Sequence, residues 1–173
     1  MHDSMRGAAK RIRELYEGDE RRPLQGYLLV MGTYGGLASA LALAGRAMGV
    51  RLPERFGPGD TVLLSIATHK ASRMLAKDAI TSPLRAPFTR YEEPAGESEL
   101  MESVRGQGAQ HAAGELISCP FCLAVWTGTA LTAGMVFAPR ATRLVCTVLT
   151  AVTASDALQL AYDGGKQALH ATG

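Results

Sequence analysis

The sequence contains no asparagine, so it has no N-glycosylation site, and it has only three cysteines in 173 residues. Three cysteines cannot form the disulfide framework of a small secreted domain. Charged residues make up 20% of the chain, below the roughly 25% of a typical soluble domain. A net charge of +2 excludes nucleic-acid binding that is driven by bulk positive charge.

Charge is also missing from two long stretches. Residues 23–45 and 116–139 contain no Asp, Glu, Lys or Arg, and each exceeds the about 20 residues that a helix needs to cross a bilayer core. The alternative is a pair of buried helices in a soluble protein. That would require a large soluble shell, which the remaining sequence cannot supply. We therefore predict insertion into a lipid bilayer.

Two weaker apolar segments add to this pattern. Residues 144–162 are apolar except for Asp156, whereas residues 61–78 begin apolar and then acquire His69, Lys70, Arg73 and Lys77. A Lys or Arg at mid-membrane costs about 2.5–3.5 kcal/mol. The second segment therefore either lies on the membrane surface or spans with its polar side packed inward. We favour spanning.

These segments predict an all-α fold, a small polytopic membrane protein with four transmembrane helices. The helices are expected at about 24–45, 61–78, 116–138 and 144–162, within a membrane domain of residues 23–162. Residues 1–22 are expected to form a polar, amphipathic N-terminal helix, and residues 163–173 a C-terminal tail. The Pro and Gly content of residues 79–114 argues against long regular structure there.

The sharpest motif for chemistry is Cys119-Pro120-Phe121-Cys122. It begins a predicted helix, and a helix N-terminus lowers the pKa of a thiol, which favours a redox dithiol. The same spacing supplies two ligands of a zinc site, with His111 and His69 as further candidates, but such a site needs three or four ligands. In the third interpretation both thiols simply pack at a helix start.

Charged residues near the membrane give two further hypotheses. Arg73 and Asp156 each lie twelve residues into their predicted helices, which is about 18 Å, so we expect an intramembrane ion pair between them, with His69 as the alternative partner. Lys77 and Arg85 could contact an anionic head group at the inner interface. The alternative for these two is simple anchoring of the cytoplasmic side.

Three stretches of the sequence together resemble a known family. They are ATHKASRMLAKDAITSPLRAPFTRYEEPAGE, GELISCPFCLAVWTGTAL and SDALQLAY, and they cover roughly residues 60–162. In combination they are similar to the bacterial membrane-protein family called domain of unknown function 1360. The resemblance implies a small multi-helix inner-membrane protein, sometimes labelled sporulation-related. It implies no established activity, substrate or cofactor.

The sequence therefore favours a non-enzymatic integral protein of the bacterial plasma membrane that binds a partner protein, a lipid or a second copy of itself. The alternative is a thiol-redox or metal-binding membrane protein that uses Cys119 and Cys122. No cofactor is expected, with zinc as the exception under that alternative. We expect no nucleic-acid partner.

The basic residues predict that both termini are cytoplasmic. With the N-terminus inside, eleven Lys and Arg residues lie on the cytoplasmic side and five on the other, as the positive-inside rule requires. Reporter fusions at Gly173 and near Pro58 should then report opposite sides of the membrane. A periplasmic signal from the Gly173 fusion would contradict this topology.

Overall fold

The computed structural model describes residues 22–171, together with residues 7, 11–12 and 15–16. The amphipathic helix predicted for residues 1–22 lies almost wholly outside the described residues.

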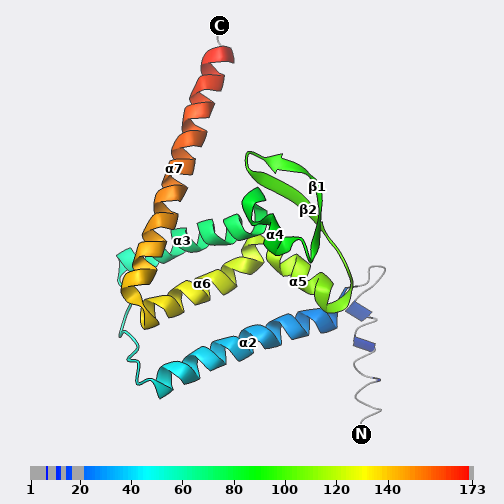
Figure 1. The fold of residues 1–173 in the computed structure, drawn as a ribbon, viewed down its shortest axis with the longest axis vertical. Helices are drawn as coiled ribbons and strands as arrows, with labels where there is room; N and C mark the ends of the chain where they lie inside the picture. Colours follow the sequence, from blue (N-terminus) through cyan, green and yellow to red (C-terminus); the bar gives the residue numbers. More distant parts are fainter. Residues whose placement is uncertain (1–6, 8–10, 13–14, 17–21, 172–173) are drawn as a thin grey trace.

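The described chain is mostly helical (Figure 1). Helices α2 and α3 come first, a pair of short turns and a hairpin follow, and helices α5, α6 and α7 complete the fold. The elements are α2 (Leu24–Ala47), α3 (Pro58–Lys77), the 3-10 turn η1 (Ala79–Thr81), α4 (Ser82–Arg85), β1 (Thr89–Gly96), β2 (Glu99–Val104), α5 (Gly108–Ser118), α6 (Pro120–Phe137) and α7 (Pro139–Ala171).

The prediction of a helical fold is confirmed, but the all-α prediction is corrected by the hairpin. β1 and β2 pair antiparallel from Thr89 opposite Val104 to Gly96 opposite Glu99. Gly96 and Ser98 both have positive φ, at 145° and 66°, and these conformations reverse the chain within a very short turn. The acidic segment that was expected to be irregular therefore forms a two-stranded sheet (Figure 1).

Two helix boundaries also differ from the sequence prediction. The helix expected over 116–138 is divided at Cys119, whose extended backbone (φ −103°, ψ 108°) separates α5 from α6. Pro120 explains this break, because a proline disfavours the helical conformation of the residue before it. The expected C-terminal tail is instead helical, since α7 continues to Ala171 and projects beyond the other helices (Figure 1).

A small core joins α3, α6 and α7. Ala67, Met135 and Cys146 are buried at its centre, one from each of these helices. The buried positions of α3 are all small residues, namely Ala67, Ala71, Ser72 and Ala76. Small side chains let helices approach closely, which explains why α3 packs extensively against both α6 and α7.

Helix α2 is held mainly at its N-terminal end, where it packs on α5. A Cβ atom added at Gly26 would lie 2.5 Å from the carbonyl oxygen of Gly108 and 2.8 Å from the Cβ atom of Ala112. Only glycine permits this approach. Against α6, by contrast, α2 makes few contacts.

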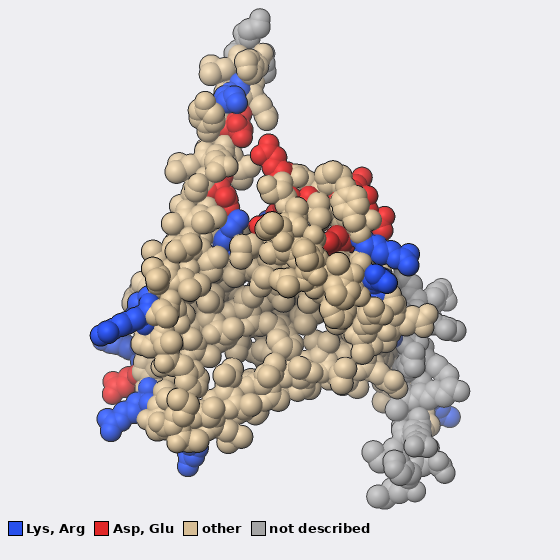
Figure 2. Space-filling view, in the orientation of Figure 1, with Lys and Arg blue, Asp and Glu red and all other residues tan. Residues whose placement is uncertain are grey.

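Three helices, α2, α6 and α7, are long and apolar enough to cross a membrane by length and composition. Only 6% of the apolar window in each is buried within the molecule. Helix α3 does not meet the same criterion, so the predicted count of four spans is not confirmed by hydropathy. Figure 2 shows a broad uncharged surface between a basic end, where α6 ends and α7 begins, and an acidic group of side chains over the hairpin.

Candidate functional site

Most of the paired charges in the described chain gather where the C-terminal end of α3 meets α4, the hairpin, α5 and the start of α6 (Figure 1). We call this region the junction. Its charged residues are Lys70, Arg73, Lys77, Asp78, Arg85, Glu99, Glu102 and Glu115, and Asp156 of α7 approaches it. The candidate thiols, Cys119 and Cys122, lie at its edge.

Arg85 is at the centre of the junction and is 1% exposed. Its guanidinium donates to both carboxylate oxygens of Glu102, at 2.6 and 3.3 Å. It also donates to the carbonyl oxygens of Leu75 and Asp78 and to the hydroxyl of Thr81. Cations near a helix C-terminus satisfy carbonyls that lack intrahelical partners. Arg85 therefore closes the end of α3 and joins it to β2.

Two other basic residues of α3, Lys70 and Arg73, also connect this helix to neighbouring elements. Lys70 Nζ lies 2.8 Å from Asp156 Oδ2 of α7. Arg73 donates to both carboxylate oxygens of Glu99 on β2, at 2.7 and 2.8 Å. These ion pairs fix α7 and the hairpin to α3.

These contacts correct the predicted pair of Arg73 with Asp156. The two helices are neighbours, as expected, because α3 packs against α7 and Asp156 is paired with a basic residue of α3. That base is Lys70, because β2 brings Glu99 to Arg73 in a bidentate arrangement. The hairpin that supplies Glu99 was not expected from the sequence.

The hypothesis that Arg85 contacts an anionic head group is also corrected. A guanidinium has five N–H donors, and in Arg85 they already reach Glu102, two carbonyls and Thr81 in a buried position. Lys77 is half-buried, and its positive charge acts on Cys119.

Asp78 has an unusual electrostatic setting within the junction. Burial raises the pKa of its carboxyl group, and the negative charges of Glu99 and Asp156 raise it further, while Lys70 and Arg85 act in the opposite direction. Desolvation disfavours the charged form of a carboxyl group. Burial, together with these two carboxylates, therefore outweighs the two basic residues, and the pKa of Asp78 lies above its ordinary value.

Glu115 of α5 ties the junction to α2. Its carboxylate accepts a hydrogen bond from Tyr27 Oη at 2.6 Å, and Arg22 and His111 lie at 3.6 and 3.5 Å. Sequence reasoning did not identify Glu115, Glu99 or Glu102 as partners. The available signal was weak, because the apolar and polar residues of ELMESV do not alternate strictly, although the last four residues of the strand alternate in burial.

The two cysteines of the CxxC motif lie together at the start of α6. Cys119 is the N-cap residue, and its sulfur accepts a hydrogen bond from the backbone N–H of Cys122 at 3.3 Å. Cys119 is half-buried and Cys122 is exposed, and both are free thiols. A side-chain acceptor at the N-cap satisfies one of the unpaired N–H groups of the first turn.

The thiol of Cys119 loses its proton more readily than an ordinary thiol. Burial raises its pKa, but hydrogen bonds from the side chain and backbone of Cys122 and from the backbone of Phe121, with the charge of Lys77, lower it by more. The net result is a pKa below the ordinary thiol value. Thiolates are the reactive form in alkylation, redox exchange and metal binding.

The predicted zinc ligands are not brought together. His111 lies 3.5 Å from Glu115, and His69 is exposed on α3. Within the part of the chain that the structure describes, no three His, Cys, Asp or Glu side chains are grouped as a metal site requires. Cys119 and Cys122 remain a pair of thiols with reactive geometry.

A family model, described as a protein of unknown function (DUF1360), matches residues 63–162. The chain belongs to the DUF1360 family. The matched residues include α3, the hairpin, α5, α6 and most of α7, so the entire junction except the α2 contacts falls within the DUF1360 region.

One curated relative adds a name to this family membership. The chain is 38% identical over 68 residues to the sporulation protein YjcA of Bacillus subtilis (strain 168). The aligned segment covers 38% of this chain and 58% of that protein. The chain thus spans somewhat more than half the length of the relative that it matches. No solved structure matches.

We predict that Arg85 and Glu102 depend on each other for stability. Arg85→Met leaves Glu102 buried without its partner. Glu102→Met likewise leaves Arg85 buried and unpaired with a carboxylate. Removing one partner of a buried pair costs about 3–5 kcal/mol. Arg85→Met with Glu102→Met should recover part of this loss. The measurement is thermal unfolding of the purified protein in detergent.

The matched control is Arg73→Met, which breaks the half-exposed pair with Glu99 and should cost no more than about 1 kcal/mol. Equal losses from Arg85→Met and Arg73→Met would contradict the central position of Arg85.

We also predict that Cys119 is alkylated at lower pH than an ordinary cysteine. Its lowered pKa places the midpoint of the rate-against-pH curve below that of a cysteine in an unfolded peptide. Cys122→Ala removes one of the hydrogen bonds that favour the thiolate, so the midpoint should rise. Iodoacetamide labelling at a series of pH values, read for each cysteine by peptide fragmentation, measures both midpoints. An unshifted midpoint in the Cys122→Ala variant would contradict this assignment.

Proposed function

We propose that the chain is an integral protein of the bacterial plasma membrane whose helices α2, α3, α6 and α7 cross the bilayer. The observation that carries this proposal is the exposure of apolar surface on three helices, each with only 6% of its apolar window buried. Leu28, Met31 and Leu43 of α2, for example, are all more than 60% exposed. In water such surface would drive aggregation, whereas hydrocarbon solvates it.

Helix α3 is proposed as the fourth span despite its charges. It packs against both α6 and α7, and its three neighbouring cations do not face lipid unpaired. Lys70 is paired with α7, Arg73 with β2, and Lys77 lies near Cys119. At the other end, Arg143 of α7 contacts Asp60 with both nitrogen-to-oxygen distances near 3.1 Å. Pairing of this kind is how ionisable residues are accommodated within helical membrane bundles.

Four crossings place the start of α2 and the end of α7 on the same side of the membrane. In this arrangement the junction, the hairpin and the extension of α7 lie in the cytoplasm, and the end with Arg46, Arg51, Arg55, Arg140 and Arg143 lies outside. The charge-free surface between these two ends supports a bilayer position between them (Figure 2). The greater number of basic residues on the junction side agrees with the positive-inside rule.

The proposed activity is non-enzymatic binding. The ionisable side chains of the junction are engaged with one another, as Arg85 is with Glu102, and they hold the elements in place. What remains exposed is the acidic outer surface of the hairpin, with Glu92 and Glu93 of β1 and Glu97 of the turn, and the projecting part of α7. A membrane protein whose cytoplasmic surface is held in place by such ion pairs is suited to bind a partner protein, a lipid or a second copy of itself. The name of the Bacillus relative, a sporulation protein, suggests a role of this kind during cell development.

A specific observation supports a second candidate function. Cys119 and Cys122 are adjacent at a helix N-terminus, and Cys119 has a lowered pKa, which is the arrangement of a reactive dithiol. A dithiol could cycle with a disulfide, or bind a soft metal with ligands from a partner. Thiol titration and metal analysis of purified protein distinguish this candidate. Inert thiols with no bound metal would exclude it.

We predict that the protein stays in the membrane fraction after an alkaline carbonate wash and that α3 crosses the bilayer. In a background without the native cysteines, Gly57→Cys should react with an impermeant maleimide on intact cells. Ala79→Cys should react only after permeabilisation, because it lies at the opposite end of α3. Ser65→Cys, in the middle of α3, should react slowly in both cases. Labelling of positions 57 and 79 from the same side would show that α3 lies on the surface.

A further inference from the structure

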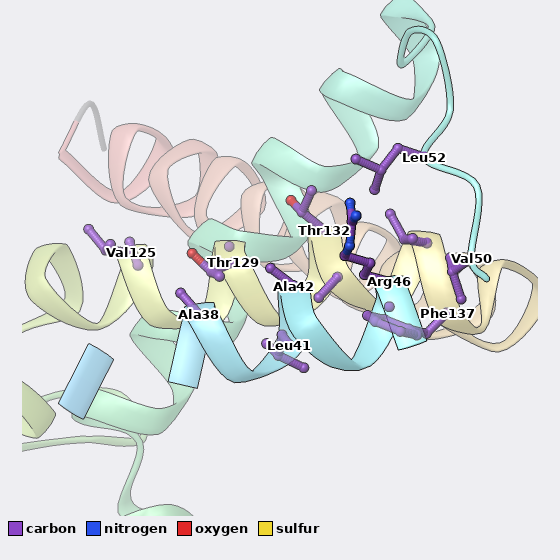
Figure 3. Close-up of a pocket in the computed structure, with 15 residues that line it drawn as sticks. Ala38, Leu41, Ala42, Arg46, Val50, Leu52, Val125, Thr129, Thr132 and Phe137 are labelled. Atoms are coloured by element: carbon purple, nitrogen blue, oxygen red, sulfur yellow. The ribbon is translucent and has the colours of Figure 1, made fainter. Parts of the chain in front are cut away.

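A deep hollow separates α2 from α6 (Figure 3). Its volume is about 890 Å³, within the roughly 300–1,000 Å³ of sites that bind small molecules. It exists because α2 is fastened to α5 by Gly26 and Tyr27 but makes few contacts with α6. We call this hollow the groove.

The two ends of the groove are defined by contacts between α2 and α6. At one end Tyr34 hydrogen-bonds Thr129 at 2.8 Å and meets the edge of Trp126, with the ring centres 5.3 Å apart. At the other end Gly45 faces Phe137, whose ring carbon would lie 3.2 Å from a Cβ atom at position 45. Along α6 the lining runs from Ala124 to Phe137, which is about 20 Å at 1.5 Å per residue.

The walls of the groove are apolar and made largely of small residues. The small lining residues are Ala38 and Ala42 of α2 and Ala124, Gly128 and Ala133 of α6. The Thr129 hydroxyl is already engaged with Tyr34. Such a long, narrow and apolar space has the shape of an extended hydrocarbon chain, and it offers little that a polar ligand could bind.

One cation interrupts this apolar lining. Arg46 rises from α2 beside Leu52 and Thr132 (Figure 3), and no described acidic side chain forms an ion pair with it. The surrounding end of the molecule also carries Arg51, Arg55, Arg140 and Arg143 against only Glu54 and Asp60. Asp60 is already bound to Arg143. This end of the groove therefore attracts negative charge.

We propose that the groove binds one acyl chain of an anionic glycerophospholipid, whose phosphate group pairs with Arg46. An apolar channel that ends at an unpaired cation matches a molecule with a hydrocarbon chain and an anionic head. A helix from a second copy is a poorer occupant, because it would bury Arg46 without supplying a counter-charge. This inference rests on the proposed membrane location.

The test is lipid binding by the detergent-purified full chain, measured by native mass spectrometry with phosphatidylglycerol and phosphatidylcholine as probes. We expect tighter binding of phosphatidylglycerol. Arg46→Gln should weaken phosphatidylglycerol binding roughly tenfold, because one charge-assisted hydrogen bond is lost. It should weaken phosphatidylcholine binding less, because the choline ammonium already offsets the charge of that phosphate. Arg140→Gln, which changes the same charge outside the groove lining, should have little effect.

The acyl-chain part of the proposal has its own variant. Ala42→Trp fills the groove and should weaken binding of both lipids, while Ala40→Trp, on another face of α2, should not. Circular dichroism checks that each variant keeps its helix content.

Four outcomes would overturn the inference. They are equal losses from Arg46→Gln and Arg140→Gln, unchanged lipid binding by Ala42→Trp, equal binding of the two lipids by the unmodified chain, and loss of a dimer on Ala42→Trp substitution. Extraction of the protein by carbonate would instead contradict the proposed membrane location, so the two failures are distinguishable.

Discussion

The buried ion pair between Arg85 and Glu102 holds the junction together. Arg85 satisfies the last carbonyls of α3, and Glu102 fixes β2 to the same point. Leaving either charge unpaired in this buried position would cost several kcal/mol. The end of α3, the two short turns and the hairpin therefore form one unit, and the ties of Arg73 to β2 and Lys70 to α7 extend from it.

The position of α2 follows from its different attachment. It is outside the matched family region, and it reaches the junction mainly through Glu115 and the close contact at Gly26. Because α2 packs mainly on α5 and touches α6 at only a few points, α2 and α6 are partly separated, and the groove lies between them. The polar contacts are concentrated at the junction. The junction is therefore firmly held, whereas the apolar helix α2 is loosely packed.

Much of the helical fold was available from the sequence, and its polar contacts were not. Hydropathy located α2, α6 and α7, and the depth argument placed α3 beside α7. The pairing of Asp156 with Lys70 rather than Arg73 could not be derived, because it depends on Glu99 occupying the neighbouring site. That glutamate belongs to a hairpin within residues 79–114, where the Pro and Gly content argued against long regular structure.

The sequence by itself determined which segments are apolar and where a helix N-terminus, with Pro120 in its first turn, would present Cys119. These are local properties, set by side-chain polarity and backbone sterics within a few residues. The tertiary structure decided which charges meet, that Arg85 is buried rather than exposed, and that α2 and α6 separate into a groove ending at Arg46. Those outcomes depend on contacts between residues that are far apart in the chain. A local sequence pattern carries no information about the spatial distance between such residues.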